Sequence, residues 1–154
     1  MGSRVRGVNV THVHPANTGD QSPPFHGEYK LSFLDVFHIA TMPVQRLFFF
    51  DGPNLPPFPT LQSSLAATLA VFLPLAGKLA FRASTGDVVM DCSPDAVPSG
   101  VQFIEAEFSG SAYDMRRLAR DEEHDTDAFV QLVPKLEAAL LPVPVLSVQV
   151  TTRE

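Results

Sequence analysis

Residues 72–79 read FLPLAGKL, and they mark the place where a helical pattern gives way to strands. Upstream of them, apolar side chains recur on one helical face: Leu61, Leu65, Leu69, Phe72 and Leu73. Thr60 can cap this helix and Pro74 ends it. Downstream, residues 79–92 predict two short strands around a turn at Gly86. The stretch therefore predicts a helix that leads directly into a β-hairpin.

Further elements extend this pattern toward both ends of the chain. Apolar and alternating residues predict strands at 4–13, 47–50, 101–108 and 145–152, and the second of these (LFFF) fits a strand buried on both faces. Ser111 and Asp114 form a capping-box pattern for a second helix that runs through residue 123, and residues 127–133 fit one more helical turn. This mixed order predicts an α/β or α+β fold, in which a mixed β-sheet with flanking helices forms one domain over residues 1–154.

Composition excludes several classes of protein. The net charge is −6, whereas nucleic-acid binding needs clustered Lys and Arg. The single cysteine, Cys92, rules out an internal disulfide and indicates a reducing compartment, where it is expected to be a buried apolar thiol. No signal-peptide core is visible, and no apolar run approaches the ~20 residues of a membrane span. We therefore expect a cytoplasmic protein that binds neither nucleic acid nor membrane.

The search for reactive groups gives few candidates. There is no glycine-rich nucleotide loop, no paired Cys or His at metal spacing, and no serine in a nucleophile elbow. His12 and His14 share one face of a predicted strand without a third ligand, and the acids around His124 are typical of a solvated helix end. His38 follows an apolar stretch and is interpreted as a satisfied core or pocket histidine, with a substrate contact as the alternative.

Several stretches together resemble a known enzyme family. They are residues 31–36 (LSFLDV), 43–50 (PVQRLFFF), 72–79 (FLPLAGKL), 133–134 (VP) and 148–151 (VQVT). Their order and spacing resemble the N-terminal part of the plant BAHD acyltransferases, in the anthocyanin and phenolic-glucoside malonyltransferase-like branch. The resemblance implies part of a chloramphenicol-acetyltransferase-like domain. It also implies transfer of an acyl group from acyl-CoA to a hydroxyl or amine of a plant specialised metabolite.

The family's two diagnostic motifs are missing from the chain. In that family an HxxxD histidine takes a proton from the acceptor, and a later DFGWG motif contains a tryptophan. The residues four places after the five histidines are Ala16, Thr18, Lys30, Met42 and Ala128, and the composition contains no tryptophan. No catalytic residue is therefore assigned. We expect a fragment truncated before HxxxD, and we expect no acyl transfer by the isolated chain. The alternatives are a non-catalytic truncated protein that binds a ligand or a partner chain, and an unstable product without function.

The resemblance implies that this chain contributes part of a substrate pocket. The segment after Asp35 lines the acceptor side of the family's active-site tunnel, which implies substrate-binding roles for His38, Thr41, Met42 and Gln45. Acyl-CoA is implied as a co-substrate, and neither a bound cofactor nor a metal is expected. In 145–152 one face is apolar (Leu146, Val148 and Val150), and this uncovered surface predicts self-association. Gly77 is interpreted as allowing a tight helix exit, with Lys78 in solvent.

Overall fold

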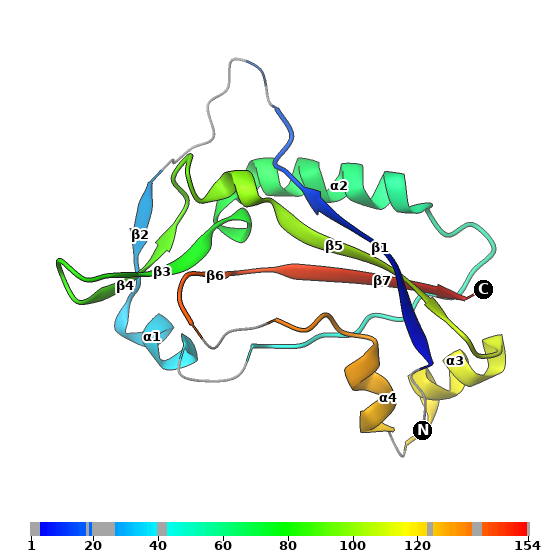
Figure 1. Cartoon of the computed structure of the whole chain (residues 1–154). Helices are drawn as coiled ribbons and strands as arrows, with labels where there is room; N and C mark the ends of the chain where they lie inside the picture. Colours follow the sequence, from blue (N-terminus) through cyan, green and yellow to red (C-terminus); the bar gives the residue numbers. More distant parts are fainter. Residues whose placement is uncertain are drawn as a thin grey trace.

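A computed structural model of the chain describes residues 4–17, 19, 27–39, 43–122, 125–136 and 140–153. In this part of the chain the strands form two sheets, one with three strands and one with four. Figure 1 shows the four-stranded sheet beyond one end of the three-stranded one, with helix α2 lying along the latter. The mixed α/β class expected from the sequence is confirmed.

The three-stranded sheet has the order β1-β5-β7, formed by Val5–Val13, Val101–Phe108 and Ser147–Arg153. Strand β1 is antiparallel to β5, and β7 is parallel to it, so this sheet is mixed as predicted. The register of β1 shifts between Gly7 and Asn9, which is a β-bulge. The bulge places two residues of β1 opposite one of β5, and along this strand Val8 and Val10 are exposed while Val13 at its end is buried.

The four-stranded sheet has the order β2-β4-β3-β6 and is antiparallel throughout. Its strands are Glu28–Lys30, Lys78–Arg82, Asp87–Asp91 and Val143–Pro144. Strands β3 and β4 are the predicted hairpin, and Gly86 in its turn has a φ of +74°, which favours glycine. Strand β6 precedes β7 by only a short link, so the chain joins the two sheets there.

Helix α2 (Phe58–Val71) provides most of the cover for the three-stranded sheet. Its first residues are Phe58 and Pro59, and Pro57 occupies the N-cap position without a side-chain cap. The expected cap at Thr60 is therefore wrong, because proline suits the first turn and the helix begins earlier. Helix α2 ends at Val71, and a 3₁₀ helix, η1 (Leu73–Ala76), follows it.

The main core lies between α2 and the three-stranded sheet. Its buried members are Val13, Leu69, Ala76, Val101 and Phe103. Leu61 and Leu65 of α2 pack against them from one side, and Leu146, Val148 and Val150 pack against them from the region of β7. The apolar face of β7 is therefore partly covered, which corrects the expectation that this face is uncovered. Strand β7 does lie at the edge of the sheet formed by the described strands.

Glycine is needed at position 77 because there is no room for a Cβ atom, and not because of its backbone angles. Its φ of −81° and ψ of −172° are extended values that any residue adopts. A Cβ atom on Gly77, however, would lie 2.7 Å from the carbonyl oxygen of Asp91 and 2.9 Å from Sγ of Cys92. Cys92 is fully buried, as predicted, and burial raises the pKa of its thiol. Gly77 thus lets the end of η1 approach the end of β4.

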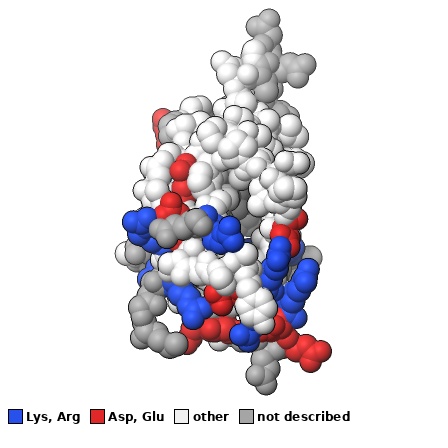
Figure 2. Space-filling view, turned by 90° about the vertical axis from the view of Figure 1, so that its right-hand side faces the viewer, with Lys and Arg blue, Asp and Glu red and all other residues white. Residues whose placement is uncertain are grey.

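Two short helices follow β5. Helix α3 (Ala112–Arg120) begins with the predicted capping box, in which Ser111 Oγ accepts from the Asp114 N–H at 3.1 Å. The helix ends at Arg120 because Asp121 has extended backbone angles, so the expected extension through residue 123 is wrong. Helix α4 (Thr126–Gln131) is capped by Asp125. Figure 2 shows charged side chains gathered over the lower part of this end of the molecule, where α3 lies, and almost none above it, over α2.

The predicted buried strand at 47–50 is wrong. Residues 43–50 form no helix or strand, and the side chains of Phe48 and Phe50 are 73% and 77% exposed. The segment passes close to α4, where the Phe49 and Phe129 ring centroids lie 6.4 Å apart. A run of aromatic residues indicates burial but does not supply a neighbouring strand. None of the described strands pairs with residues 47–50.

Candidate substrate-binding site

Helix α1 (Phe33–Ile39) positions the residues of the candidate site, and a local hydrogen-bond box fixes where it begins. Asp35 Oδ2 accepts hydrogen bonds from the Ser32 backbone N–H at 2.8 Å and from the Ser32 hydroxyl at 2.6 Å. The Asp35 N–H in turn donates to Ser32 Oγ at 3.3 Å. These reciprocal bonds satisfy donors that a helix start leaves unpaired, so they hold the first turn and its side chains in place.

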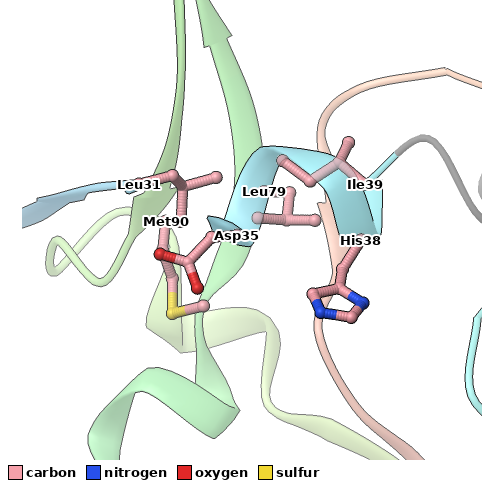
Figure 3. Close-up of a pocket in the computed structure, with 6 residues that line it drawn as sticks. All are labelled: Leu31, Asp35, His38, Ile39, Leu79 and Met90. Atoms are coloured by element: carbon pink, nitrogen blue, oxygen red, sulfur yellow. The ribbon is translucent and has the colours of Figure 1, made fainter. Parts of the chain in front are cut away.

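An open cavity of about 220 Å³ lies between α1 and the four-stranded sheet. It is lined by Leu31, Asp35, His38, Ile39, Leu79 and Met90. Figure 3 shows Asp35 and His38 projecting from α1 to the same side of the helix, with Leu79 and Met90 contributed by the strands behind. Leu79 and Met90 are paired residues of the β3–β4 hairpin. The cavity therefore combines an apolar wall with two polar groups.

Asp35 is the charged group of this cavity. Hydrogen bonds from Ser32 hold the pKa of its carboxyl below the ordinary value, and nearby His38 acts in the same direction. The group is thus ionised at neutral pH. Its negative charge lies beside an imidazole that is itself exposed and touches the edge of the Phe37 ring, with centroids 5.9 Å apart. A carboxylate and an imidazole next to an apolar wall can orient a small molecule that carries hydroxyl groups.

The structure locates two of the four site residues expected from the sequence. His38 lines the cavity and is exposed, which fits a pocket histidine and not a core one. Gln45 is also exposed but does not line this cavity. Thr41 and Met42 lie outside the described residues. The substrate contacts of all four residues stay a prediction.

Sequence reasoning missed Leu79 and Met90 as members of the site. The signal was present, because the hairpin had been expected and pairing across its turn brings these two residues opposite each other. What the sequence did not show is that α1 lies against that hairpin. This contact is made between segments far apart in the chain, and no local pattern indicates it.

Metal binding gains no support from the described part of the chain. No group of three or more His, Cys, Asp or Glu side chains there is arranged to hold a metal ion. His12 lies in β1 and His14 just after it, while His124 lies outside the described residues. No helix built from described residues is long and apolar enough to cross a bilayer.

A family model described as "Transferase family" matches residues 9–154, which is nearly the whole chain. The chain belongs to this family, the BAHD acyltransferases. It is 32% identical over 152 residues to malonyl-CoA:anthocyanidin 5-O-glucoside-6''-O-malonyltransferase of Arabidopsis thaliana, covering 97% of this chain and 32% of the relative. It is 28% identical over 158 residues to phenolic glucoside malonyltransferase 1 of the same plant, covering 98% of this chain and 32% of the relative.

The fold is also similar to a solved acyltransferase structure. Vinorine synthase superposes with a TM-score of 0.57 at 18% identity, covering 97% of this chain and 35% of that one. In both comparisons the BAHD chain described here spans about a third of the length of its relatives. The match therefore supports the family and the fold of this third.

Proposed function

We propose that this BAHD chain forms the N-terminal third of an acyltransferase that moves an acyl group from acyl-CoA to a hydroxyl or amine of a plant specialised metabolite. The observation that carries the proposal is the family match over residues 9–154. In this proposal the cavity beneath α1 is part of the acceptor site. Asp35 and His38 would hydrogen-bond acceptor hydroxyl groups while Leu79 and Met90 pack against its apolar part.

Exposed apolar surface supports a larger assembly. Phe33 and Leu34 on α1 are 90% and 75% exposed, and Phe48 and Phe50 are exposed in the segment 43–50. Large apolar patches on soluble proteins mark surfaces that another part or another chain covers. Because the relatives are about three times as long, their remaining two-thirds offer the surface that would cover these residues.

The chemistry also requires the rest of the enzyme. Deprotonation of the acceptor needs a base within hydrogen-bond reach of the attacking oxygen or nitrogen. No histidine in this sequence is followed four places later by aspartate. His38 lies on an exposed helix rim and acts in this proposal by orienting the acceptor. The general base and the remainder of the acyl-CoA site would come from the part of the relatives that this chain does not span.

The alternative is a non-catalytic protein that binds a ligand or another acyltransferase chain. Two observations favour this alternative. The chain forms a cavity that could hold a ligand, and its sequence lacks the HxxxD base. The two functions differ in what happens when the missing two-thirds are supplied. A catalytic third becomes active in that context, whereas a protein that evolved only for binding does not.

The first experiment incubates the isolated chain with malonyl-CoA and flavonoid glucosides, with products followed by mass spectrometry. We expect no turnover, since loss of a general base alone typically costs about 10²–10⁴-fold. Steady turnover above a control without protein would contradict the need for a complementing part.

The second experiment places this chain in a hybrid, in exchange for the matching third of the Arabidopsis malonyltransferase. Acyl transfer by the hybrid would support the proposal, and His38→Ala should raise KM for the acceptor more than it lowers kcat. His14→Ala is the matched control, because His14 is exposed and does not line the cavity. A folded but inactive hybrid would favour the binding protein.

A further inference from the structure

A second cavity, of about 400 Å³, lies on the other side of strand β3. Lys78 lines this cavity, while its neighbour Leu79 lines the one beneath α1. Successive side chains of a strand point to opposite faces, so the two cavities lie on opposite faces of β3. Among the described residues, none lines both cavities. The volume falls within the roughly 300–1,000 Å³ typical of small-molecule sites.

The charges around this cavity are all of one sign. Lys78 and Lys135 line it, and none of the described residues that line it is acidic. This is unusual for a chain with 17 acidic and 11 basic residues. Elsewhere in the described structure most basic side chains form ion pairs, as Arg6, Lys30, Arg82, Arg116 and Arg117 do. Lys78 and Lys135 form none with a described carboxylate.

Polar groups that can bond an anion complete the lining. The Lys78 ammonium donates a hydrogen bond to the hydroxyl of Ser99, which also lines the cavity. The Ser147 hydroxyl donates to Oε1 of Gln102 at 3.1 Å, and both of these residues face the cavity. Ammonium groups, hydroxyls and an amide are the donors that surround bound phosphate oxygens in proteins.

The backbone at the cavity wall also needs a specific residue. Gly100, which lines the cavity, has a φ of +66°, and a Cβ there would lie 3.1 Å from the Val13 carbonyl oxygen and 3.0 Å from Cε1 of His14. Glycine therefore allows the start of β5 to approach the end of β1. This close approach places His12 and Gln102, which are paired across the two strands, at one cavity.

We propose that this second cavity binds the phosphate group of a small phosphorylated molecule. Two lysines from separate parts of the chain can neutralise a dianion, and lysine binds phosphate as a compact point charge. Each carboxylate group carries a single charge on two oxygens, so malonate divides its two charges between separate groups, whereas phosphate presents its charge on one compact cluster of oxygens to these donors. The phosphate can come from free phosphate or from a coenzyme A thioester. The site does not depend on the acyltransferase proposal, since no described residue lines both this cavity and the one beneath α1.

The test is calorimetric titration of the full chain at low ionic strength with inorganic phosphate, and with malonate as the carboxylate comparison. Phosphate should bind more tightly than malonate, and Lys135→Ala should weaken phosphate binding roughly tenfold, as loss of a charged hydrogen-bond partner does. Lys135 is exposed and lies outside the helices and strands, so its substitution leaves the fold intact. Lys78→Ala should act similarly, and Lys78→Arg should retain much of the affinity.

Lys30→Ala is the matched control, because Lys30 pairs with Asp87 and does not line the cavity. If it weakens binding as much as Lys135→Ala does, the effect is a general loss of charge and the proposal is wrong. Tighter binding of malonate than of phosphate would also overturn it. Titration with coenzyme A and with its form lacking the 3′-phosphate shows which phosphate binds. If coenzyme A binds more tightly and Lys135→Ala removes that difference in affinity, the 3′-phosphate occupies the site. Equal affinity for both identifies another phosphate. These binding measurements need no acyl transfer, so their failure is separate from failure of the proposed enzyme.

Discussion

Substituting Gly77 by alanine tests the packing that joins η1 to the second sheet. The added Cβ would lie 2.7 Å from the Asp91 carbonyl oxygen and 2.9 Å from Cys92 Sγ, both closer than a methyl group tolerates. The first of these atoms belongs to the backbone of β4, so it cannot move without shifting the strand that β2 and β3 both pair with. The backbone angles of Gly77 suit alanine, and the whole penalty is steric.

The expected cost follows from overpacking. Inserting one carbon into a tightly packed site typically destabilises a protein by about 1–3 kcal/mol. With a urea m-value of roughly 1–3 kcal/mol/M, the unfolding midpoint should fall by about 1 M. Gly52→Ala is the matched control: nothing lies within 4 Å of its added Cβ, so its midpoint should stay close to that of the parent.

Urea unfolding followed by far-ultraviolet circular dichroism measures both variants, because the chain contains no tryptophan for fluorescence. A second readout is the rate at which a thiol reagent modifies Cys92. Burial and the raised pKa of this thiol keep it slow in the parent, and we expect the strained variant to react faster. If Gly77→Ala unfolds at the same urea concentration as Gly52→Ala, the close approach argued for FLPLAGKL is wrong.

Three further predictions concern the cap, acid stability and association. Ser111→Ala should cost about 1 kcal/mol by removing the α3 cap, and Ser111→Asn should restore most of it; equal unfolding midpoints would contradict the cap's role. Partial burial opposes ionisation of Asp91, but hydrogen bonds from Ser93 and Arg82 outweigh it and lower the pKa of its carboxyl. Ionised Asp91 therefore stabilises the fold above the unfolded-state pKa of about 4, and this stability is lost as pH falls through the lower folded-state pKa. Arg82→Gln should shift this loss to higher pH in an acid titration. Sedimentation at micromolar concentration should show self-association that Phe50→Ser reduces, whereas a monomeric parent would refute the exposed patch as its cause.

Local patterns predicted the local parts of the fold. The capping box at Ser111, the hairpin around Gly86 and the strand at 101–108 depend on hydrogen bonds and alternation within a few residues, and each appears in the structure. The start of α2 was misplaced because Thr60 is a residue type that caps helices, whereas the helix begins at Phe58, and proline, here Pro59, is favoured in the first turn of a helix.

The prediction of a buried strand at residues 47–50 was wrong for a different reason. Their aromatic run indicates that the segment is apolar, and it gives no information on what covers it. In this chain no described strand pairs with it, and the side chains of Phe48 and Phe50 are exposed. The candidate site shows the same limit. The His38 region was predicted as part of the site from the resemblance, whereas Leu79 and Met90 enter the cavity only because α1 lies against the hairpin, and that contact is not local.

Strand β3 connects these observations. FLPLAGKL ends inside it, so the stretch that joins α2 to the hairpin also sets which face each side chain of β3 takes. A register slip of one residue would move Leu79 away from the α1 cavity and Lys78 away from the basic one. Gly77 holds that register by its contact with the end of β4, and Leu79 is paired with Met90 across the hairpin. The tight packing at Gly77 is therefore a requirement for both cavities, and Gly77→Ala should weaken phosphate binding as well as stability.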